Sequence, residues 1–163
     1  QFIDDMLYVQ VVPADGKRLL FAHAQFFEPE EFGYLAIHEE DDPCPPYFDH
    51  LDRMSSGDRL FIGHHHYSSF LNYEDEEPHI SPEEDYDLHG NSAVIILVGA
   101  VGQPRIPEMK DAQYALYDAQ EDRLAFHHVS YNYKATIEKI KKCGFSNRTQ
   151  AELIKFLEPE QKK

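Results

Sequence analysis

The sequence has few cysteines and no long apolar run, and each shortage excludes a class of protein. Its two cysteines, Cys44 and Cys143, are too few for the disulfide frameworks that stabilise small secreted domains. The sequence contains neither a signal peptide nor an apolar stretch long enough to cross a membrane. We therefore expect a cytoplasmic protein that does not associate with membranes.

Basic residues are also scarce. The chain has 15 Lys and Arg residues against 30 Asp and Glu residues, which gives a formal net charge of -15. Such an excess of carboxylates argues against strong nucleic-acid affinity and against binding to an anionic membrane surface, because both require clustered cations. An acidic protein can still act on a phosphate ester, provided that bound cations reverse the local field.

The length favours one domain. With 163 residues, 42% of them hydrophobic, the chain can bury one sizeable core, so we expect residues 1–163 to form a single domain. The first residue is Gln, not Met, and the sequence opens in the middle of an element. We therefore expect a fragment or a processed chain.

Apolar runs separated by turn residues predict alternating strands and helices. The predicted strands are 18–23, 58–62, 93–98, 112–117 and 124–131. The predicted helices are 46–54, 134–142 and 149–157. The first two strands with the helix between them form the strand, helix, strand pattern of an α/β fold, and the last two strands should pair antiparallel.

Two further local predictions concern charged segments. Residues 73–87 are dense in Asp and Glu, and we interpret them as a solvated loop because a run of like charges resists burial. In the helix at 134–142, we expect Ala135, Ile137 and Ile140 to face inward, and Gly144 to follow the helix as its C-terminal cap.

Three adjacent histidines follow the apolar run at 60–62. If the segment stays extended, His64 and His66 project to the same side and His65 to the other. Neutral imidazole is a common ligand of zinc, iron and manganese, and Gly63 permits a tight turn just before the three rings. The pattern therefore indicates either a metal site or histidines that are solvated or hydrogen-bonded.

The order of four short motifs resembles the C-terminal half of the calcineurin-like metallophosphoesterases, in the bacterial and archaeal phosphodiesterase branch. The resemblance extends from about Leu7 to Leu157. The motifs are Leu20-Phe21-Ala22-His23, Phe61-Ile62-Gly63-His64-His65-His66, Val98-Gly99-Ala100-Val101-Gly102-Gln103-Pro104-Arg105 and Tyr114-Ala115-Leu116-Tyr117-Asp118. The third motif is the most specific.

This resemblance implies an α/β fold, part of a metallophosphoesterase-type β-sandwich of two sheets flanked by helices. It implies that His23 and His64 bind one divalent metal ion and that His66 binds a second, with Mn, Fe, Zn, Ni and Mg all possible. Two such ions can acidify a bridging water and clamp the phosphoryl oxygens, so the implied activity is hydrolysis of a phosphodiester or phosphomonoester by a metal-bound hydroxide. The implied substrate is a phosphate-ester small molecule or a nucleotide.

The family also has an Asp-x-His, a Gly-Asp and a Gly-Asn-His-Asp/Glu motif, and none of these occurs before His23. The string at 87–91 spells Asp-Leu-His-Gly-Asn, which is either a coincidence, as we favour, or a displaced ligand motif. Gly57-Asp58 begins a strand, and we interpret it as part of a turn, where Gly and Asp are common residues. Ala100 replaces a usual serine, and His65 is interpreted as a group behind the ligands or as an exposed side chain.

Other residues carry weaker signals. Arg105 could bind a substrate phosphate or hold its loop by pairing with a carboxylate. His127 and His128 are expected to be surface or core imidazoles and not ligands. The sequence lacks both Gly-x-Ser-x-Gly and a phosphate-binding loop ending in Lys-Ser or Lys-Thr.

Two functional hypotheses follow. In the first, the chain is the C-terminal portion of a metal-dependent phosphoesterase, in which His64 and His66 are catalytic. In the second, it is a noncatalytic metal-binding or protein-interaction domain derived from that fold.

Overall fold

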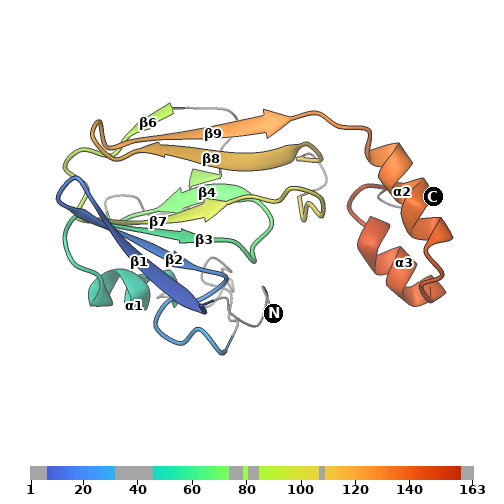
Figure 1. The fold of residues 1–163 in the computed structure, drawn as a ribbon, viewed down its shortest axis with the longest axis horizontal. Helices are drawn as coiled ribbons and strands as arrows, with labels where there is room; N and C mark the ends of the chain where they lie inside the picture. Colours follow the sequence, from blue (N-terminus) through green and yellow to red (C-terminus); the bar gives the residue numbers. More distant parts are fainter. Residues whose placement is uncertain (1–6, 32–45, 74–78, 81–84, 107–108, 159–163) are drawn as a thin grey trace.

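The computed structural model describes residues 7–31, 46–73, 79–80, 85–106 and 109–158, which form two β-sheets and three helices (Figure 1). The six strands of sheet A lie in the order β1-β2-β3-β7-β4-β5, and those of sheet B in the order β6-β9-β8. The strands are β1 Val9–Ala14, β2 Lys17–Ala22, β3 Asp58–Ile62, β4 Ser68–Leu71, β5 His79–Ile80, β6 Asp85–Asp87, β7 Ala93–Val98, β8 Ala112–Asp118 and β9 Arg123–Val129. The helices are α1 Pro46–Arg53, α2 Tyr133–Lys142 and α3 Asn147–Ile154.

The strand, helix, strand pattern of the first half is confirmed. β2 pairs parallel with β3, and β3 pairs parallel with β7. The helix α1 packs on sheet A through Tyr47 and Leu51, which join Leu60 and Leu97 in one buried cluster. Because the three strands run in the same direction, their carboxyl ends meet at one edge of the sheet.

Strand β1 was not predicted. It pairs antiparallel with β2 through a two-residue turn, in which Asp15 and Gly16 both have positive φ (49° and 78°). Asp-Gly is typical of this type of hairpin turn because both residues tolerate the left-handed conformation. Pro13 lies within β1 and cannot donate a ladder hydrogen bond, which the position of β1 at the edge of the sheet allows.

The second half of the chain builds sheet B and closes the core. The predicted hairpin is confirmed, since β8 and β9 pair antiparallel over their full length. β7 is buried on both faces: Ile95 and Leu97 lie in the cluster with α1, whereas Val94 and Ile96 pack with Phe126 of sheet B. A strand covered on both sides is expected to be continuously apolar, as this one is.

A buried ion pair joins the two sheets. Arg59 of β3 donates to both carboxylate oxygens of Asp122, at 3.0 and 2.8 Å, and to the carbonyl of Leu88 at 3.2 Å. Arg59 is 1% exposed and Asp122 3%. Burial opposes ionisation of Asp122, but hydrogen bonds from Arg59 and Tyr117 outweigh it, so the pKa of Asp122 lies below its usual value.

The last two helices are confirmed with small shifts of their ends. Asn132 and Ser146 cap them by accepting hydrogen bonds from the N–H groups of Ala135 and Thr149, and Gly144 follows α2 with a φ of 72°. The inward placement of Ala135 was wrong: Ile137 is buried, whereas Ala135 is exposed because the short α2 presents only one narrow face to its surroundings.

The prediction of a loop over 73–87 was wrong at residues 79–80 and 85–87. Residues 79–80 pair with β4 and residues 85–87 pair with β9, so both form short strands. In β6, Asp85 and Asp87 remain exposed while Tyr86 packs toward Phe70, which reconciles a charged sequence with a strand. Residues 74–78 and 81–84 lie outside the described part. Among the described residues, the helices are too short or too polar to cross a membrane.

Candidate functional site

The backbone brings His23 and the histidine run together at one edge of sheet A. His23 directly follows β2, Gly63 directly follows β3, and the Gly63 N–H donates to the His23 carbonyl at 3.0 Å. This bond continues the parallel pairing by one residue beyond the strands. The location of both segments at the carboxyl end of a parallel pair is where open α/β sheets place their ligands.

The histidine run itself is not extended, so the condition on which His64 and His66 would project to the same side is not met. His64 and His66 have φ values of 54° and 64°, and the His65 N–H donates to the Gly63 carbonyl at 2.5 Å, which closes a tight three-residue turn around His64. Left-handed conformations at residues other than glycine are costly and cluster at functional sites. Here they allow the chain to reverse before β4, which runs antiparallel to β7.

His23 and His64 meet through their rings. The Nε2 atom of His23 lies 3.3 Å from the Nδ1 atom of His64, and the two rings stand edge to face. Two imidazole nitrogens at about 2.0–2.1 Å from one ion, at a near-tetrahedral angle, lie about 3.3–3.4 Å apart. The observed spacing therefore fits two ligands of one metal ion, and this donor pair suits the divalent ions that the resemblance implies.

His66 points toward a different part of the edge. Its Nδ1 atom lies 2.6 Å from the carbonyl oxygen of Gln103. Because a carbonyl can only accept, Nδ1 must carry the proton, which leaves Nε2 with its lone pair when the ring is neutral. A hydrogen bond from one ring nitrogen to a backbone carbonyl is the usual support of a metal-binding histidine.

His65 is buried, and the prediction that it could be an exposed side chain was wrong. It is 2% exposed and contacts the ring of Tyr67 edge to face. Burial lowers the pKa of His65 to about 4, and the neighbouring His64 and Arg105 lower it in the same direction. His65 is therefore neutral at pH 7 and packs behind the other two imidazoles.

The loop after β7 carries the Gln103 carbonyl and is held by Gln113 of β8. The Gln113 backbone N–H donates to the Ala100 carbonyl at 2.9 Å, and its side-chain amide donates to the Met109 carbonyl at 3.3 Å. Gly99 has a φ of 91°, and a Cβ atom placed there would lie 2.5 Å from the Cβ of Gln113. Sequence reasoning missed Gln113, and only the glycine directly after an apolar strand hinted at this close approach.

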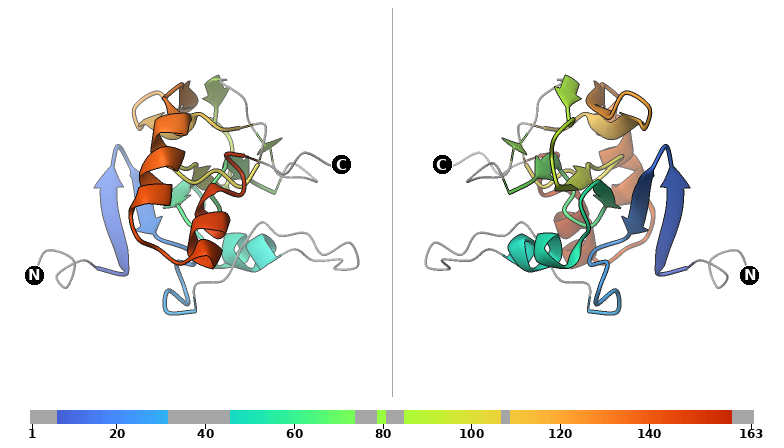
Figure 2. Two further views of the ribbon diagram at one scale, coloured as in Figure 1. Left: turned by 90° about the vertical axis from the view of Figure 1, so that its right-hand side faces the viewer. Right: turned by 90° about the vertical axis from the view of Figure 1, so that its left-hand side faces the viewer.

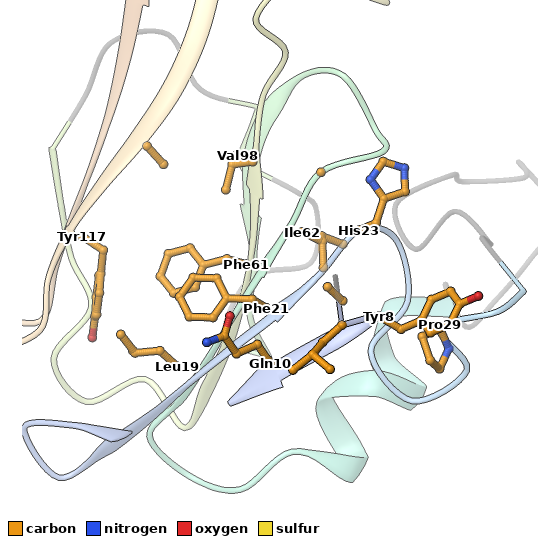
Figure 3. Close-up of a pocket in the computed structure, with 14 residues that line it drawn as sticks. Tyr8, Gln10, Leu19, Phe21, His23, Pro29, Phe61, Ile62, Val98 and Tyr117 are labelled. Carbon is orange, nitrogen blue, oxygen red and sulfur yellow. The ribbon is translucent and has the colours of Figure 1, made fainter. Parts of the chain in front are cut away.

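Arg105 closes the same loop near His65, whose pKa its charge lowers. Its proposed contact with a substrate phosphate stays a prediction. A groove of about 920 Å³ lies beside this edge, and Figure 3 shows Phe21 and Phe61 among its lining residues, between His23 on one side of the view and Tyr117 on the other. The two rings stack at 5.2 Å.

The string at 87–91 lies at the other end of the sheet. The Gly57 N–H donates to the Ser92 carbonyl, so this segment adjoins the beginning of β3, whereas the histidines follow its end, about 13 Å away at 3.3 Å per residue. The side chain of Asp87 accepts from the N–H and ring of His89, and Asn91 bonds back to Leu88. The segment forms a turn, in keeping with the interpretation that its match to the family's Asp-x-His motif is a coincidence.

The remaining motif residues have structural contacts. Asp58 accepts two hydrogen bonds from Arg18 and one from the Ser55 N–H, so the Gly57-Asp58 step is turn chemistry as predicted. His127 stacks on Tyr114 on sheet B, and the Nε2 atom of His128 lies 3.4 Å from the Ser68 hydroxyl. Within the described ranges, no group of three or more His, Cys, Asp or Glu side chains is arranged to hold a metal ion.

Comparisons with known proteins find similarity both in sequence and in structure. The chain is 30% identical over 142 residues to the uncharacterized protein MJ0912 of Methanocaldococcus jannaschii, which covers 87% of this chain and 53% of that protein. The chain thus spans about half the length of the curated relative that it matches. No family model matches the sequence.

Both structural neighbours cover nearly all of the chain. The crystal structure of a metallophosphoesterase from Sphaerobacter thermophilus superposes with a TM-score of 0.74 at 20% identity, over 95% of this chain and 61% of that one. The hypothetical protein PH1004 from Pyrococcus horikoshii superposes with a TM-score of 0.63 at 18% identity, over 93% of this chain and 52% of that one. Together with the two sheets and three helices, these likenesses show that the chain has a mixed α/β, metallophosphoesterase-like fold.

Proposed function

We propose that this chain is the C-terminal part of a metal-dependent phosphoesterase, which hydrolyses a phosphodiester or phosphomonoester of a small molecule or nucleotide. The observation that carries the proposal is the 3.3 Å spacing of the His23 and His64 ring nitrogens at the carboxyl ends of β2 and β3. The likeness of the fold to a metallophosphoesterase supports it.

In this proposal, each histidine has a separate task. His23 and His64 hold one divalent metal ion through Nε2 and Nδ1, and His66 holds a second through Nε2, with its ring oriented by the Gln103 carbonyl. When bound, two such ions supply positive charge at the phosphoryl oxygens and lower the pKa of a water molecule. Arg105 binds a phosphate oxygen of the substrate, for which its planar guanidinium is suited.

The test uses the complete protein, which this proposal expects to extend N-terminally of residue 1. Purified protein is assayed with bis(p-nitrophenyl) phosphate, with and without added Mn²⁺, and its metal content is measured. We expect turnover that depends on Mn²⁺. His64→Ala should lower kcat/KM by more than about 100-fold, because even residues that merely support a ligand contribute about 10–100-fold.

The matched control is His127→Ala, which removes an imidazole of sheet B that stacks on Tyr114. This variant should keep its turnover, and circular dichroism should show that both variants keep the fold. Normal turnover and normal metal content in His64→Ala would refute the ligand role. Absence of Mn²⁺-dependent turnover in the wild-type protein would refute the phosphoesterase itself.

A second function has one observation in its favour. Within the described part of the chain, no three potential ligands converge, so these residues by themselves offer a pair of imidazoles and a third that points elsewhere. This favours a noncatalytic domain with the same fold, which binds a metal ion or another protein. Wild-type protein that binds Mn²⁺ but leaves the phosphodiester intact would support this function.

A further inference from the structure

The hairpin formed by α2 and α3 lies at the same end of the molecule as the candidate histidines. In Figure 1, β3, β7 and β9 run toward this end, and α2 follows β9. Seen from this end in Figure 2, left, the two helices lie in front of the sheets. Since His23 and the run beginning at Gly63 follow the carboxyl ends of β2 and β3, the hairpin and the imidazoles share one end of the sandwich.

The hairpin differs in charge from the rest of the chain. Residues 133–163 contain eight Lys and Arg residues against four Glu residues, whereas residues 1–132 contain seven Lys and Arg residues against 26 Asp and Glu residues. Eight of the fifteen Lys and Arg residues of the protein therefore lie in this C-terminal stretch, which includes the hairpin. The remainder would repel an anion that approaches the histidines through water.

The cations of the hairpin face solvent. Its six described Lys and Arg side chains, Lys134, Lys139, Lys141, Lys142, Arg148 and Lys155, are all exposed. Lys141 and Lys142 form ion pairs with Glu158 and Glu138. None of the carboxylates described in the structure forms an ion pair with Lys134, Lys139 or Arg148, so these three charges are available to a ligand.

The hairpin also contributes little to the core. Across residues 133–154, Ile137 is the buried side chain of the two helices, and α3 has none. Packing against the core therefore does not explain why the exposed faces of α2 and α3 are rich in lysine. These lysines are accessible to a ligand in solution.

We propose that the α2–α3 hairpin attracts the phosphate-ester substrate to the histidine edge by its positive potential, an inference that rests on the proposed function. Electrostatic attraction raises the rate of encounter and the local concentration of a charged ligand, by about 10-fold or more in favourable cases. It acts before the chemical step, so it changes KM and leaves kcat unchanged. Salt weakens it because the Debye length falls from about 30 Å at 0.01 M to about 8 Å at 0.15 M ionic strength.

The experiment reverses the three available charges in the complete protein, as Lys134→Glu, Lys139→Glu and Arg148→Glu combined. For bis(p-nitrophenyl) phosphate at low ionic strength, we expect KM to rise about 10-fold with kcat within about twofold, and this difference should shrink in salt. Glu152→Lys should lower KM. A matched pair compares Lys139→Glu with Arg123→Glu, which reverses an exposed cation at the start of β9, and only the former should raise KM.

A binding measurement separates this inference from the proposed function. Titration calorimetry with inorganic pyrophosphate at low ionic strength follows anion binding whether or not the protein hydrolyses an ester. We expect the triple variant to bind pyrophosphate at least about fivefold more weakly than the wild type. If the wild type hydrolyses the ester and the triple variant has the same KM, the inference is overturned while the phosphoesterase stands. If the wild type shows no turnover, equal pyrophosphate binding by both proteins overturns the inference.

Discussion

A backbone carbonyl and a tight turn help to orient the imidazoles at this edge. The Gln103 carbonyl fixes the proton of His66 on Nδ1, and the turn around His64 aims its Nδ1 at His23. Two residues in left-handed conformation make this possible, at a cost of about 1–3 kcal/mol each. The site is thus defined by backbone geometry that the surrounding sheet must hold in place.

Gly99 is the residue where this dependence can be measured. Gly99→Ala places a methyl group 2.5 Å from the Cβ of Gln113 and imposes a φ of 91° on a residue with a side chain. We expect a loss of about 2–4 kcal/mol in the free energy of unfolding, from backbone strain and overpacking together. Urea denaturation followed by circular dichroism measures it.

The control for this substitution lies three residues further on. Gly102 belongs to the same loop, but a Cβ added there would meet nothing within 4 Å. Gly102→Ala should therefore change the free energy of unfolding by less than about 0.5 kcal/mol. An equally small effect of Gly99→Ala would show that the loop can move away from Gln113.

At the scale of elements, β3 carries both the site and the link between the sheets. Its last residue, Ile62, precedes the histidine run, and its second residue, Arg59, pairs with Asp122 in the turn between β8 and β9 of sheet B. Removing one partner of a buried pair costs about 3–5 kcal/mol, because the other charge stays buried without compensation. Stability should therefore be sensitive to substitution of either residue and to acid.

Asp122→Asn tests this pair. Asparagine tolerates the φ of 44° at this position, so the backbone is preserved while the charge is lost. At pH 7, we expect a loss of about 3–5 kcal/mol in the free energy of unfolding, measured by urea denaturation. The control, Asp85→Asn, removes an exposed carboxylate 3.9 Å from Arg123 and should cost less than about 1 kcal/mol.

The same pair gives a pH dependence with a definite sign. The pKa of Asp122 in the folded state lies below its value in the unfolded chain, which is about 3.9. The contribution of ionised Asp122 to the stability of the folded state is therefore fully present above about pH 4, and it is lost as the pH falls through the folded pKa. The difference in the free energy of unfolding between the wild type and Asp122→Asn should shrink as the pH is lowered from 5 through the folded pKa of Asp122. A difference that stays constant over this range would contradict the lowered pKa of Asp122.

The elements that the sequence predicted are those with continuous apolar patterns. The runs at 58–62 and 93–98 became β3 and β7 with the same boundaries, and the hairpin of β8 and β9 followed the expected pairing. β4 was missed because it is four residues long and begins with two serines, which are buried between its neighbours. Its apolar content is too small to show a period.

At the candidate site, the sequence identified which residues meet but not how they are oriented. His23 and His64 lie in contact, and before the structure only the family resemblance linked these two residues, through the shared metal ion that it implies. The left-handed backbone at His64 and His66 could not be predicted, since these are not glycines and only the return of the chain into β4 requires the turn. The support from Gln103 and Gln113 depends on tertiary contacts between segments distant in sequence.

At the scale of the whole molecule, 26 of the 30 Asp and Glu residues lie in residues 1–132, and eight of the fifteen Lys and Arg residues lie in residues 133–163. Like charges on the larger part repel one another in the folded state more than in the expanded unfolded chain. Added salt screens this repulsion over distances beyond the Debye length. The folded state should therefore gain stability from salt.

The measurement is urea denaturation at two ionic strengths, about 0.01 M and about 0.15 M, in NaCl at pH 7. We expect the midpoint of unfolding to move to a higher urea concentration at the higher ionic strength. The slope of the free energy of unfolding against urea concentration should not change. A midpoint that moves down would mean that attractive pairs such as Arg18 with Asp58 outweigh the repulsion. A parallel series in sucrose distinguishes charge screening from general exclusion of the solute.

The link between Arg59 and Asp122 also sets the order in which the molecule can assemble. The two residues are 63 positions apart, so Arg59 emerges from the ribosome long before its carboxylate does. A half-made chain that packed β3 would bury an uncompensated guanidinium, which is strongly unfavourable. Stable closure of sheet A on sheet B therefore waits until residue 122 has been synthesised.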